Sequence, residues 1–534
     1  MDSFDYIVVG AGSAGCAVAA RLSEDPGCRV LLLEAGGRDD KLLIDMPAGW
    51  GKTQDPASPF NWAFETEAEP GLGGRSVPLP RGKVLGGSSA INGLIYIRGQ
   101  HEDYDDWVMA GAPGWGWADL APYFRRMERN LGIADEHHGK DGPIAVSDLV
   151  DPTPLAEVMI RAAEQAGVPR TRDFNGARQE GVGPYQATIA HARRCSAARG
   201  YLHPARKRKN LAVHTGALVA GVVIEGGRAT GVRYQLGGQE KLAAARAEVI
   251  LCAGAIGSPQ ILMLSGIGPG AELARHGIPV RVDAPAVGAD LQDHLVVPLM
   301  WRLRDGQPSM NPRLGGARVL LEVMNYLMRK RGAMTMPAAE VGIFLRSRAD
   351  LLRPDLQFHL LPLSGDLDGE HKKLHGFPGY TLAPNVCRPT SRGVVSLASA
   401  DPAARPRLRM NYLSTEHDVE VTLAGMAWAR RIAAAPALAA ITAGEVYPGA
   451  AATTREQLLD YARRAGSTGH HPVGTCRMGS DAAAVVDTTL AVRGVTGLRV
   501  ADASVMPRLI SGNTNATSIV IGERAAEFAR AARR

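Results

Sequence analysis

Two adjacent histidines near the C-terminal end are the side chains best suited to acid–base chemistry. His470 and His471 stand in the stretch 469–474 (GHHPVG), where the proline and glycines prevent a regular helix and place both imidazoles on a loop. An imidazole with an ordinary pKa of about 6.5 is neutral near pH 7 and can accept the hydroxyl proton of an alcohol. Taken alone, these residues fit a general base and a structural His-Pro turn equally well.

A second polar cluster follows closely along the chain. Asn513, Thr514 and Asn515 come directly before the last predicted helix, which runs from about 516 to 531. The positive end of that helix would point toward whatever lies beside Asn515 and would stabilise negative charge there. The preceding stretch 500–505 (VADASV) is typical of a last strand that reaches the same place.

The elements that would position such a site begin with a dinucleotide-binding pattern at the N-terminus. A β-branched run at 5–9 ends in the GxGxxG of Gly10, Gly12 and Gly15; a small apolar helix covers 13–22 and a second buried strand covers 29–33. Glu34 closes that strand, where a carboxylate accepts hydrogen bonds from a ribose diol. The glycines permit a tight turn, the approach of backbone amides to a pyrophosphate and close helix packing. From this stretch alone, NAD and FAD both remain open.

A glycine- and hydroxyl-rich loop lies at 82–93 (GKVLGGSSAING). Its adjacent glycines, two serines and Asn92 form a backbone-rich loop of the kind that binds a phosphate or the edge of a flat polar ring. A long proline-rich connection at 37–81 separates this loop from Glu34. Such a connection is either a wall over a cofactor site or a surface excursion.

Together these motifs resemble the glucose-methanol-choline (GMC) oxidoreductase family. The resemblance rests on the opening unit, the 82–93 loop, a second signature at 254–268, the stretch 291–294 (LQDH) and the two C-terminal motifs. It implies an α/β fold in which a Rossmann-like FAD-binding domain is interleaved with an α+β substrate domain built on an antiparallel sheet. We predict that residues 1–150, 200–293 and 466–534 form the FAD-binding domain and that 151–199 and 294–465 form the substrate domain.

The resemblance implies that FAD is held without a covalent bond. Some members attach FAD through a histidine directly before the asparagine of the 82–93 loop, and Ile91 stands at that position here. The segment near Val219 would contact the adenine end. The implied cofactor-binding residues are Gly10, Gly12, Ser13, Ala14, Gly15, Glu34, Ala35, Trp62, Val84, Gly87, Asn92, Gly93, Val219, Ala253, Asp502, Ala503, Asn513 and Thr514.

The resemblance also implies a catalytic pair. In the family, the histidine before the proline and the second asparagine of a GNxN motif act together, and they match His471 and Asn515. His471 would accept the hydroxyl proton while the carbinol carbon delivers hydride to flavin N5, and Asn515 would hydrogen-bond the oxygen as negative charge develops. His470 would either shape the substrate pocket or face solvent. We therefore expect an FAD-dependent alcohol dehydrogenase that oxidises a small alcohol, with a primary alcohol favoured, and passes electrons to a quinone or another carrier.

Other activities of the same scaffold remain open. An oxidase that passes the electrons to O2 and releases H2O2 fits the sequence equally well. Hydroxynitrile lyases keep the flavin and the histidine without net redox chemistry, whereas the His/Asn pair argues against a flavin photodecarboxylase. The chain looks most like bacterial choline, sorbose and aliphatic-alcohol dehydrogenases, but no clear cation site for choline is visible.

Composition argues against several other classes. The 534 residues carry 60 Lys+Arg and 54 Asp+Glu, and the net charge of +6 is spread along the chain, which argues against a nucleic-acid partner. The six scattered cysteines form no CxxC pair, and neither a signal peptide nor a transmembrane run is visible. We expect a cytoplasmic protein, with a peripheral position at the inner membrane left open, and the sequence does not predict its oligomeric state.

Two further clusters are interpreted as structural. His137 and His138 stand in a glycine-rich turn that we predict to be exposed and, lacking a third ligand in register, to bind no metal. Trp107, Trp115 and Trp117 are interpreted as packing a loop against the core rather than as a cage for a cation.

Overall fold

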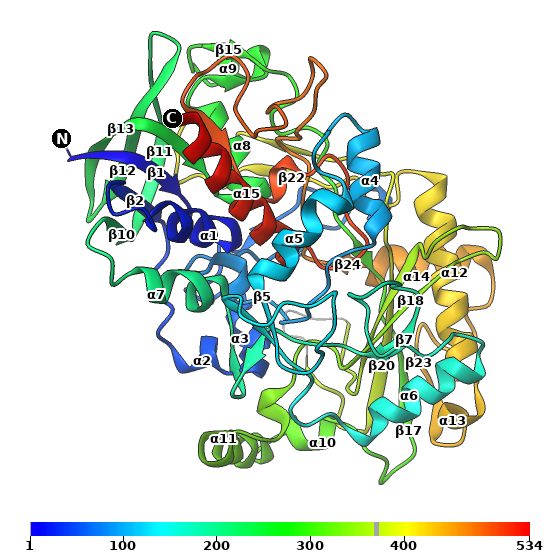
Figure 1. Ribbon diagram of the computed structural model, residues 1–534. Helices are drawn as coiled ribbons and strands as arrows, with labels where there is room; N and C mark the ends of the chain where they lie inside the picture. Colours follow the sequence, from blue (N-terminus) through cyan, green and yellow to red (C-terminus); the bar gives the residue numbers. More distant parts are fainter. Residues whose placement is uncertain (1, 368–372, 534) are drawn as a thin grey trace.

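Two large sheets, each with its own hydrophobic core, organise the chain in the computed structural model, which describes residues 2–367 and 373–533 (Figure 1). The first sheet is built from the two ends of the sequence and its middle. The second belongs mainly to residues 295–468. Together they confirm the α/β fold expected from the sequence, with a Rossmann-like part and an antiparallel part.

The first sheet has the strand order β10-β2-β1-β13-β12-β11, and β25 pairs with the C-terminal end of β13. β10, β2, β1, β13 and β25 run parallel, whereas β12 runs antiparallel to both of its neighbours, β13 and β11. The valine and leucine runs of β1 and β2 are buried, as is typical of strands at the centre of a parallel sheet. The strands are β1 (Asp2–Val9), β2 (Val30–Glu34), β10 (Leu211–Thr215), β11 (Ala217–Glu225), β12 (Arg228–Leu236), β13 (Gln239–Leu251) and β25 (Leu498–Val500).

Two helices from opposite ends of the chain pack side by side against this sheet. Figure 1 shows α1 (Ser13–Leu22, blue) beside α15 (Asn515–Arg533, red), and the two helices are in contact along their length. The hydroxyl of Tyr6 donates to the carbonyl of Ala529 (3.0 Å), and the fully buried carboxylate of Glu523 accepts from the hydroxyl of Tyr201 (2.6 Å) and pairs with Arg21 (2.9 Å). The start and the end of the sequence therefore fold as one unit.

The tryptophan cluster packs against the same unit. Trp107 and Trp115 are fully buried, and their indole N–H groups donate to the carbonyls of Arg508 and Thr488 (2.9 Å each). Trp117 stacks on Phe124. This confirms the interpretation of the tryptophans as packing residues.

The second sheet is antiparallel, with the order β23-β17-β20-β19-β18-β7, and β16 joins β20 to β24. Residues 295–303 form two strands, β16 and β17, and Pro298 between them has no backbone N–H to donate. β21 lies outside this sheet and pairs with β22 in a separate small sheet. The strands of the second sheet are β7 (Gly181–Pro184), β16 (Leu295–Val296), β17 (Leu299–Leu303), β18 (Val341–Leu345), β19 (Leu356–Leu361), β20 (Gly379–Val386), β23 (Thr442–Tyr447) and β24 (Ser467–Thr468).

Helices and short hairpins complete the two parts. The remaining helices are α2 (Leu42–Asp45), α3 (Trp50–Thr53), α4 (His101–Met109), α5 (Trp117–Met127), α6 (Pro154–Gln165), α7 (His203–Ala205), α8 (Gly254–Leu264), α9 (Gly270–Arg275), α10 (Asn311–Leu314), α11 (Arg318–Arg329), α12 (Glu416–Ala433), α13 (Pro436–Ala439) and α14 (Arg455–Ala465). The short strands are β3 (Phe64–Glu65), β4 (Pro78–Leu79), β5 (Glu128–Asn130), β6 (Ile144–Val146), β8 (Ile189–Ala190), β9 (Arg193–Arg194), β14 (Ile267–Gly268), β15 (Val282–Asp283), β21 (Val394–Ser396) and β22 (Arg407–Arg409). No helix among residues 2–367 and 373–533 is both long and apolar enough to cross a bilayer.

The two cores do not follow the predicted domain boundaries at every point. Phe64, Leu72, Val77 and Leu79 fall within the segment 1–150, yet they pack in the core of the second sheet. This happens because β4 of the β3–β4 hairpin contacts β24 of the second sheet. The detailed boundaries of the two domains stay a prediction.

Candidate active site

Residues from both sheets line one cavity of about 1040 Å³. Three helices, α1, α8 and α15, begin at its wall, so their positive ends face the same space. The proline-rich connection at 37–81 contributes Leu43, Met46, Trp50 and Trp62 to the lining. All the site residues predicted from the sequence line this cavity except Gly15 and Val84.

Close backbone contacts explain the glycines at the start of α1. Gly10 has φ +97°, and a Cβ there would lie 2.5 Å from the carbonyl oxygen of Cys252. A Cβ on Gly15 would lie 1.9 Å from the carbonyl oxygen of Gly10. Gly15 therefore lies behind the cavity and lets the helix begin close to the strand.

The 82–93 loop packs directly on this turn. Gly87 has φ +52°, and a Cβ on it would lie 2.7 Å from the Cα of Gly12. Val84 is fully buried and forms a bridge with Gly37, so it supports the loop without reaching the cavity. Side chains are thus excluded from the place where the two loops meet.

Two buried carboxylates hold the backbone around this cradle. Glu34 accepts hydrogen bonds from the N–H groups of Ala11 (2.9 Å) and Gly36 (2.8 Å), and burial raises its pKa to about 7. Asp502 accepts from the N–H of Gly254 (2.9 Å) and the hydroxyl of Ser258 (2.6 Å) at the first turn of α8. A cradle without side chains, a helix N-terminus and an acid at the end of β2 fit the dinucleotide cofactor expected from the sequence.

The histidine loop is held against the 291–294 segment by backbone hydrogen bonds. Gly469 donates to the carbonyl of His294 (2.6 Å), and Gln292 and Val473 exchange two bonds of 3.0 Å. The N–H of His471 donates to Asp293 Oδ1 (2.7 Å). Asp293 Oδ2 accepts from the hydroxyls of Tyr412 (2.6 Å) and Thr468 (2.5 Å), so both carboxylate oxygens fix this loop.

The hydrogen bonds of His294, whose ring contacts that of His471, determine the tautomer of His471. His294 Nε2 lies 2.9 Å from the carbonyl oxygen of Cys387, which can only accept, so Nε2 carries the proton of His294. In a neutral ring, His294 Nδ1 is then an acceptor, and it lies 2.9 Å from His471 Nδ1. His471 Nδ1 must donate, which makes Nε2 the acceptor nitrogen of this ring.

Both rings are neutral at pH 7. Burial lowers the pKa of His294 to about 4. Burial also lowers the pKa of His471 well below its usual value, and the neighbouring His294, His359, His470 and Arg81 lower it further. His471 therefore combines the correct charge and the correct tautomer to accept a proton at Nε2.

The structure gives His471 a different asparagine from the one expected. Asn513 Nδ2 lies 3.0 Å from His471 Nε2, whereas Asn515 Oδ1 accepts a hydrogen bond from the hydroxyl of Ser13 (2.7 Å). Asn515 is the first residue of α15, and helical side chains lean toward the N-terminus, which here meets the start of α1. In the structure, Asn513 rather than Asn515 therefore contacts His471, and the catalytic role of each asparagine stays a prediction.

Other residues of the site follow or extend the sequence analysis. His470 lies in the left-handed region (φ +66°) and lines the cavity next to His471. Asp293, His294 and His359 were missed as site residues. The LQDH stretch drew attention to the first two without giving them a role, and His359 lies in a strand pattern that contains no motif.

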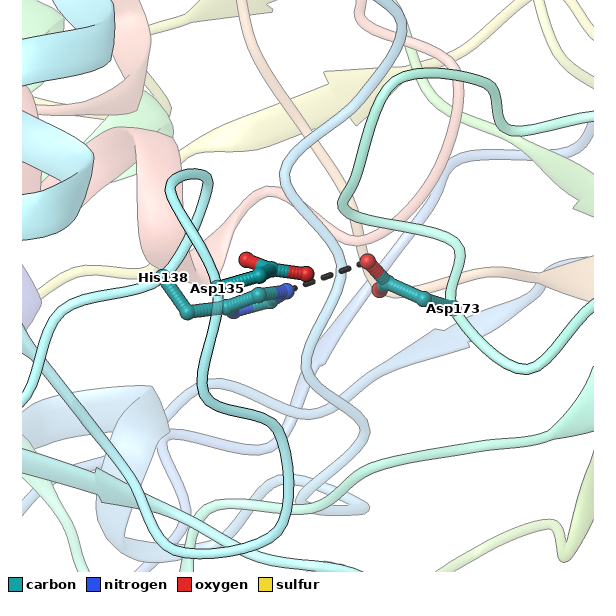
Figure 2. A group of neighbouring side chains, drawn as sticks. All are labelled: Asp135, His138 and Asp173. Atoms are coloured by element: carbon teal, nitrogen blue, oxygen red, sulfur yellow. Dashed lines mark hydrogen bonds and ion pairs between the residues drawn. The ribbon is translucent and has the colours of Figure 1, made fainter.

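The other histidine group differs from its prediction. His138 is only 4% exposed, so the expected exposed turn is wrong at this residue. Figure 2 shows the side chains of Asp135 and His138 both directed toward Asp173, and the three side chains offer ligand atoms within 4.8 Å of one another. The ring is already engaged, because Nδ1 lies 2.9 Å from Glu128 and Nε2 lies 3.0 Å from Asp173.

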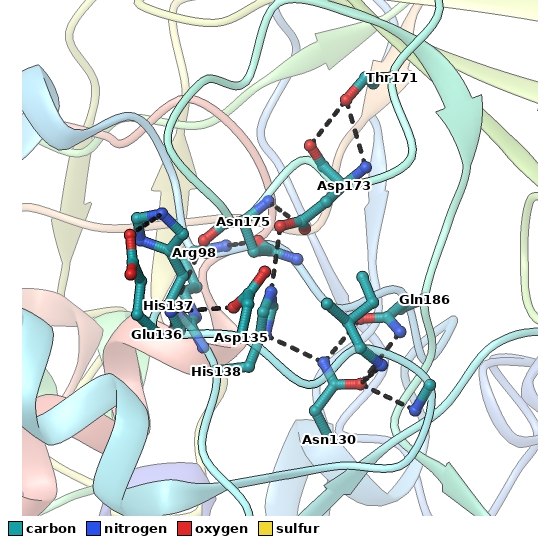
Figure 3. Close-up of polar contacts among 12 residues, drawn as sticks. Arg98, Asn130, Asp135, Glu136, His137, His138, Thr171, Asp173, Asn175 and Gln186 are labelled. Carbon is teal, nitrogen blue, oxygen red and sulfur yellow. Dashed lines mark hydrogen bonds and ion pairs between the residues drawn. The ribbon is translucent and has the colours of Figure 1, made fainter.

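Paired charges account for this group. Burial lowers the pKa of His138, but the hydrogen bonds to Asp173 and Glu128 outweigh it and raise the pKa to about 9. The guanidinium of Arg98 pairs with Glu128. The backbone N–H of Arg98 donates to Asn175 (2.8 Å), a bond that belongs to the network in Figure 3. With a proton on each ring nitrogen, His138 has no lone pair to offer a metal ion.

This fold and site define a flavin-dependent oxidoreductase with a nucleotide domain and a substrate domain. The chain belongs to the GMC oxidoreductase family: its N-terminal model matches residues 4–296 and its C-terminal model matches residues 389–522. Family membership confirms the resemblance seen in the sequence, the oxidoreductase class and FAD as the cofactor.

Curated relatives cover almost the whole chain. The alcohol dehydrogenase [acceptor] of Pseudomonas putida is 44% identical over 530 residues, which is 98% of this chain and 95% of that protein. The oxygen-dependent choline dehydrogenase of Photobacterium profundum is 41% identical over 531 residues, 98% of this chain and 92% of that protein.

Solved structures share the fold. Pyridoxine 4-oxidase from Mesorbium loti is similar with a TM-score of 0.89 and 32% identity, covering 98% of both chains. A formate oxidase variant of Aspergillus oryzae gives a TM-score of 0.92 with 27% identity, covering 99% of this chain and 98% of that one.

Proposed function

We propose that this protein is an FAD-dependent dehydrogenase for primary alcohols with an apolar chain, and that it passes the electrons to a quinone or another carrier. One observation carries the proposal: a neutral His471, with its lone pair on Nε2, lies on the wall of the nucleotide cavity beside Asn513. The named relatives include an alcohol dehydrogenase that uses an acceptor.

The residues of the chain divide the work of oxidation between them. FAD, when bound, supplies the acceptor for the hydride of the carbinol carbon. His471 Nε2 takes the hydroxyl proton, while its Nδ1–H stays bound to His294. The amide of Asn513 is placed to donate to the substrate oxygen as negative charge grows, and its Oδ1 is buried with no partner among the residues of the described structure.

The wall of the cavity supports an apolar substrate. Leu314, Val319, Val323, Met334 and Met336 all line it. The guanidinium of Arg81 also lines the cavity and donates to the carbonyl of His470 (2.8 Å). A positive charge beside the histidines opposes binding of a quaternary ammonium group such as that of choline.

The same wall supports a non-covalent cofactor. Ile91 lines the cavity at the position where the resemblance places the histidine of covalent members. Its side chain is a hydrocarbon and offers no atom that forms such a bond. We expect acid precipitation of the holoenzyme to release all of its FAD into the supernatant.

An anaerobic substrate screen tests the proposal. Linear 1-alkanols, polyols and choline are mixed with the purified holoenzyme, and the flavin absorbance is followed. We expect the alkanols to bleach the flavin, with choline inactive and His471→Ala as the matched unreactive control. A screen in which no alcohol bleaches the flavin would overturn redox function and favour a lyase, and stoichiometric H2O2 in air would favour an oxidase.

A further inference from the structure

Helix α11 (Arg318–Arg329) presents a row of large apolar side chains to solvent. Leu320, Leu321 and Met328 are 65%, 70% and 69% exposed, and Met324 and Leu327 are about half exposed. Their three- and four-residue spacing places them together along one side of the helix. Apolar rows of this kind on an otherwise polar surface mark interaction sites.

The opposite side of the same helix is part of the protein. Tyr326 is buried, and Val319 and Val323 pack on the cluster that contains Met310 and Met334. Val319 and Val323 also line the active-site cavity. The helix is therefore a wall between that cavity and the outside, and Figure 1 shows it at the edge of the molecule.

Basic side chains stand at both ends of the apolar row. Arg318 begins the helix, Arg329 ends it, and Lys330 and Arg331 follow, all of them exposed. Among residues 2–367 and 373–533, no carboxylate pairs with Arg318, Arg329 or Lys330, whereas Arg331 pairs with Asp151 (3.0 Å). The one acid of the helix, Glu322, is paired with Arg313 (2.7 Å).

We propose that α11 docks this protein on an anionic lipid bilayer. The helix would lie in the plane of the headgroups with its apolar row toward the acyl chains and its basic ends at the lipid phosphates. Docking would bring the apolar wall of the cavity to the bilayer surface, where apolar alcohols are concentrated. The proposal goes beyond the redox function and does not depend on it.

The charges favour a lipid surface over a second copy of this chain. Two copies that paired through α11 would set Arg318 of one helix beside the basic end or the Arg318 of the other. Like charges at every contact of the helix ends oppose that arrangement, whereas lipid phosphates neutralise both ends at once. An anionic bilayer therefore fits both the apolar and the charged parts of the surface.

Vesicle binding of the holoenzyme tests the proposal. The probe is phosphatidylglycerol–phosphatidylethanolamine vesicles, with phosphatidylcholine vesicles for comparison and flotation as the measurement. We expect binding to the anionic vesicles, a fall of about 5-fold for each charge removed in Arg329→Gln and Lys330→Gln, and a fall of about 100-fold or more in the triple variant Leu321→Glu, Met324→Glu, Met328→Glu. The matched control is Met109→Glu on α4, because Met109 is 85% exposed and α4 lies at the other end of the molecule in Figure 1.

Several outcomes would overturn the proposal. They are no binding of the wild type to anionic vesicles, equal binding to phosphatidylcholine, or an equal loss in the Met109→Glu control. A dimer in analytical ultracentrifugation that the triple variant converts to monomer, without vesicle binding, would assign the surface to a second copy instead. Unchanged flavin absorbance and thermal unfolding establish that the variants are folded, and because no substrate is present, the result is independent of the proposed activity.

Discussion

His294 Nδ1 lies 2.9 Å from His471 Nδ1, and this contact determines which nitrogen of His471 is free to act as a base. The carbonyl of Cys387 fixes the proton of His294, and His294 in turn fixes the proton of His471. When both rings are neutral, these two hydrogen bonds place one proton on His294 Nε2 and the other on His471 Nδ1. His294 is therefore a positioning residue for the proposed base.

Removal of the imidazole of His471 tests the base directly. We expect His471→Ala to keep FAD and to reduce the rate of flavin reduction by roughly 10²–10⁴-fold, because the methyl group of alanine cannot accept the hydroxyl proton. Stopped-flow absorbance under anaerobic conditions measures the rate. His470→Ala is the neighbouring control, and an equal effect in both variants would contradict the assignment.

Replacement of His294 tests the positioning role. We expect His294→Phe to lower kcat by roughly 10-fold or more with little change in KM, because His471 is then free to place its proton on Nε2. His294→Gln offers an amide N–H for Cys387 and an oxygen for His471, so it should restore part of the rate. The pH profile of kcat should shift in the phenylalanine variant alone; unchanged profiles in both variants would speak against this role.

Substitution of Asn513 should affect the rate of flavin reduction, whereas substitution of Asn515 should affect FAD binding. Asn513→Ala is expected to lower the rate of flavin reduction by about 10²-fold or more, because it removes the amide beside His471 Nε2. Asn515→Ala breaks the contact between α15 and Ser13, so its main effect should be weaker FAD retention. Reduction rates and FAD dissociation constants separate the two, and the reverse pattern would restore the pairing first expected from the sequence.

Acid should destabilise the protein through its buried neutral histidines. Burial lowers the pKa of His294 and of His359 to about 4, against 6.5 for the exposed ring. The unfolded chain therefore binds protons first as the pH falls, so the stability from each group is complete above pH 6.5 and is lost as the pH falls toward 4. At about 1.4 kcal/mol per pKa unit, each ring accounts for about 3 kcal/mol.

Urea unfolding at a series of pH values measures this effect. The fall in unfolding free energy between pH 6.5 and 4 should be smaller in His294→Gln, which has no ring to protonate. If the unfolding free energy of this variant falls with pH as steeply as that of the wild type, the low pKa of His294 is contradicted.

The charged network around His138 should respond in the opposite direction. Hydrogen bonds raise the pKa of His138 to about 9, so its contribution to stability is complete below pH 6.5 and is lost as the pH rises through 9. His138→Gln leaves the buried carboxylate of Glu128 and the partly buried one of Asp173 with fewer partners and should cost about 3–5 kcal/mol. His137→Gln is the matched control, and EDTA should change neither melting temperature; a loss of stability in EDTA would assign a metal to the group of His138.

The sequence predicts the fold well where local spacing and tertiary packing agree. The glycines at 10, 12 and 15 do what their spacing indicates, because the same backbone contacts occur wherever a helix starts this close to a strand. Between β16 and β17, Pro298 interrupts an apolar run, because proline has no backbone N–H to donate.

Spacing alone is insufficient where two similar residues compete for one role. Asn513 and Asn515 both precede the last helix, and only the residue at which α15 begins decides which of them leans toward α1. His138 lies in a turn-like stretch, yet Glu128 and Asp173, distant along the chain from each other, surround it. The burial of His138 depends on these distant segments, so no local sequence pattern indicates it.

The hydrogen bond between Ser13 and Asn515 joins residues that are 502 positions apart. A ribosome makes the phosphate loop long before α15, so the newly made first helix has no partner while the residues between them are translated. Until α15 is made, the apolar face of α1 lacks the helix that packs on it, and Ser13 lacks Asn515. A message truncated by a late stop codon would thus yield a chain with an intact nucleotide motif and no flavin.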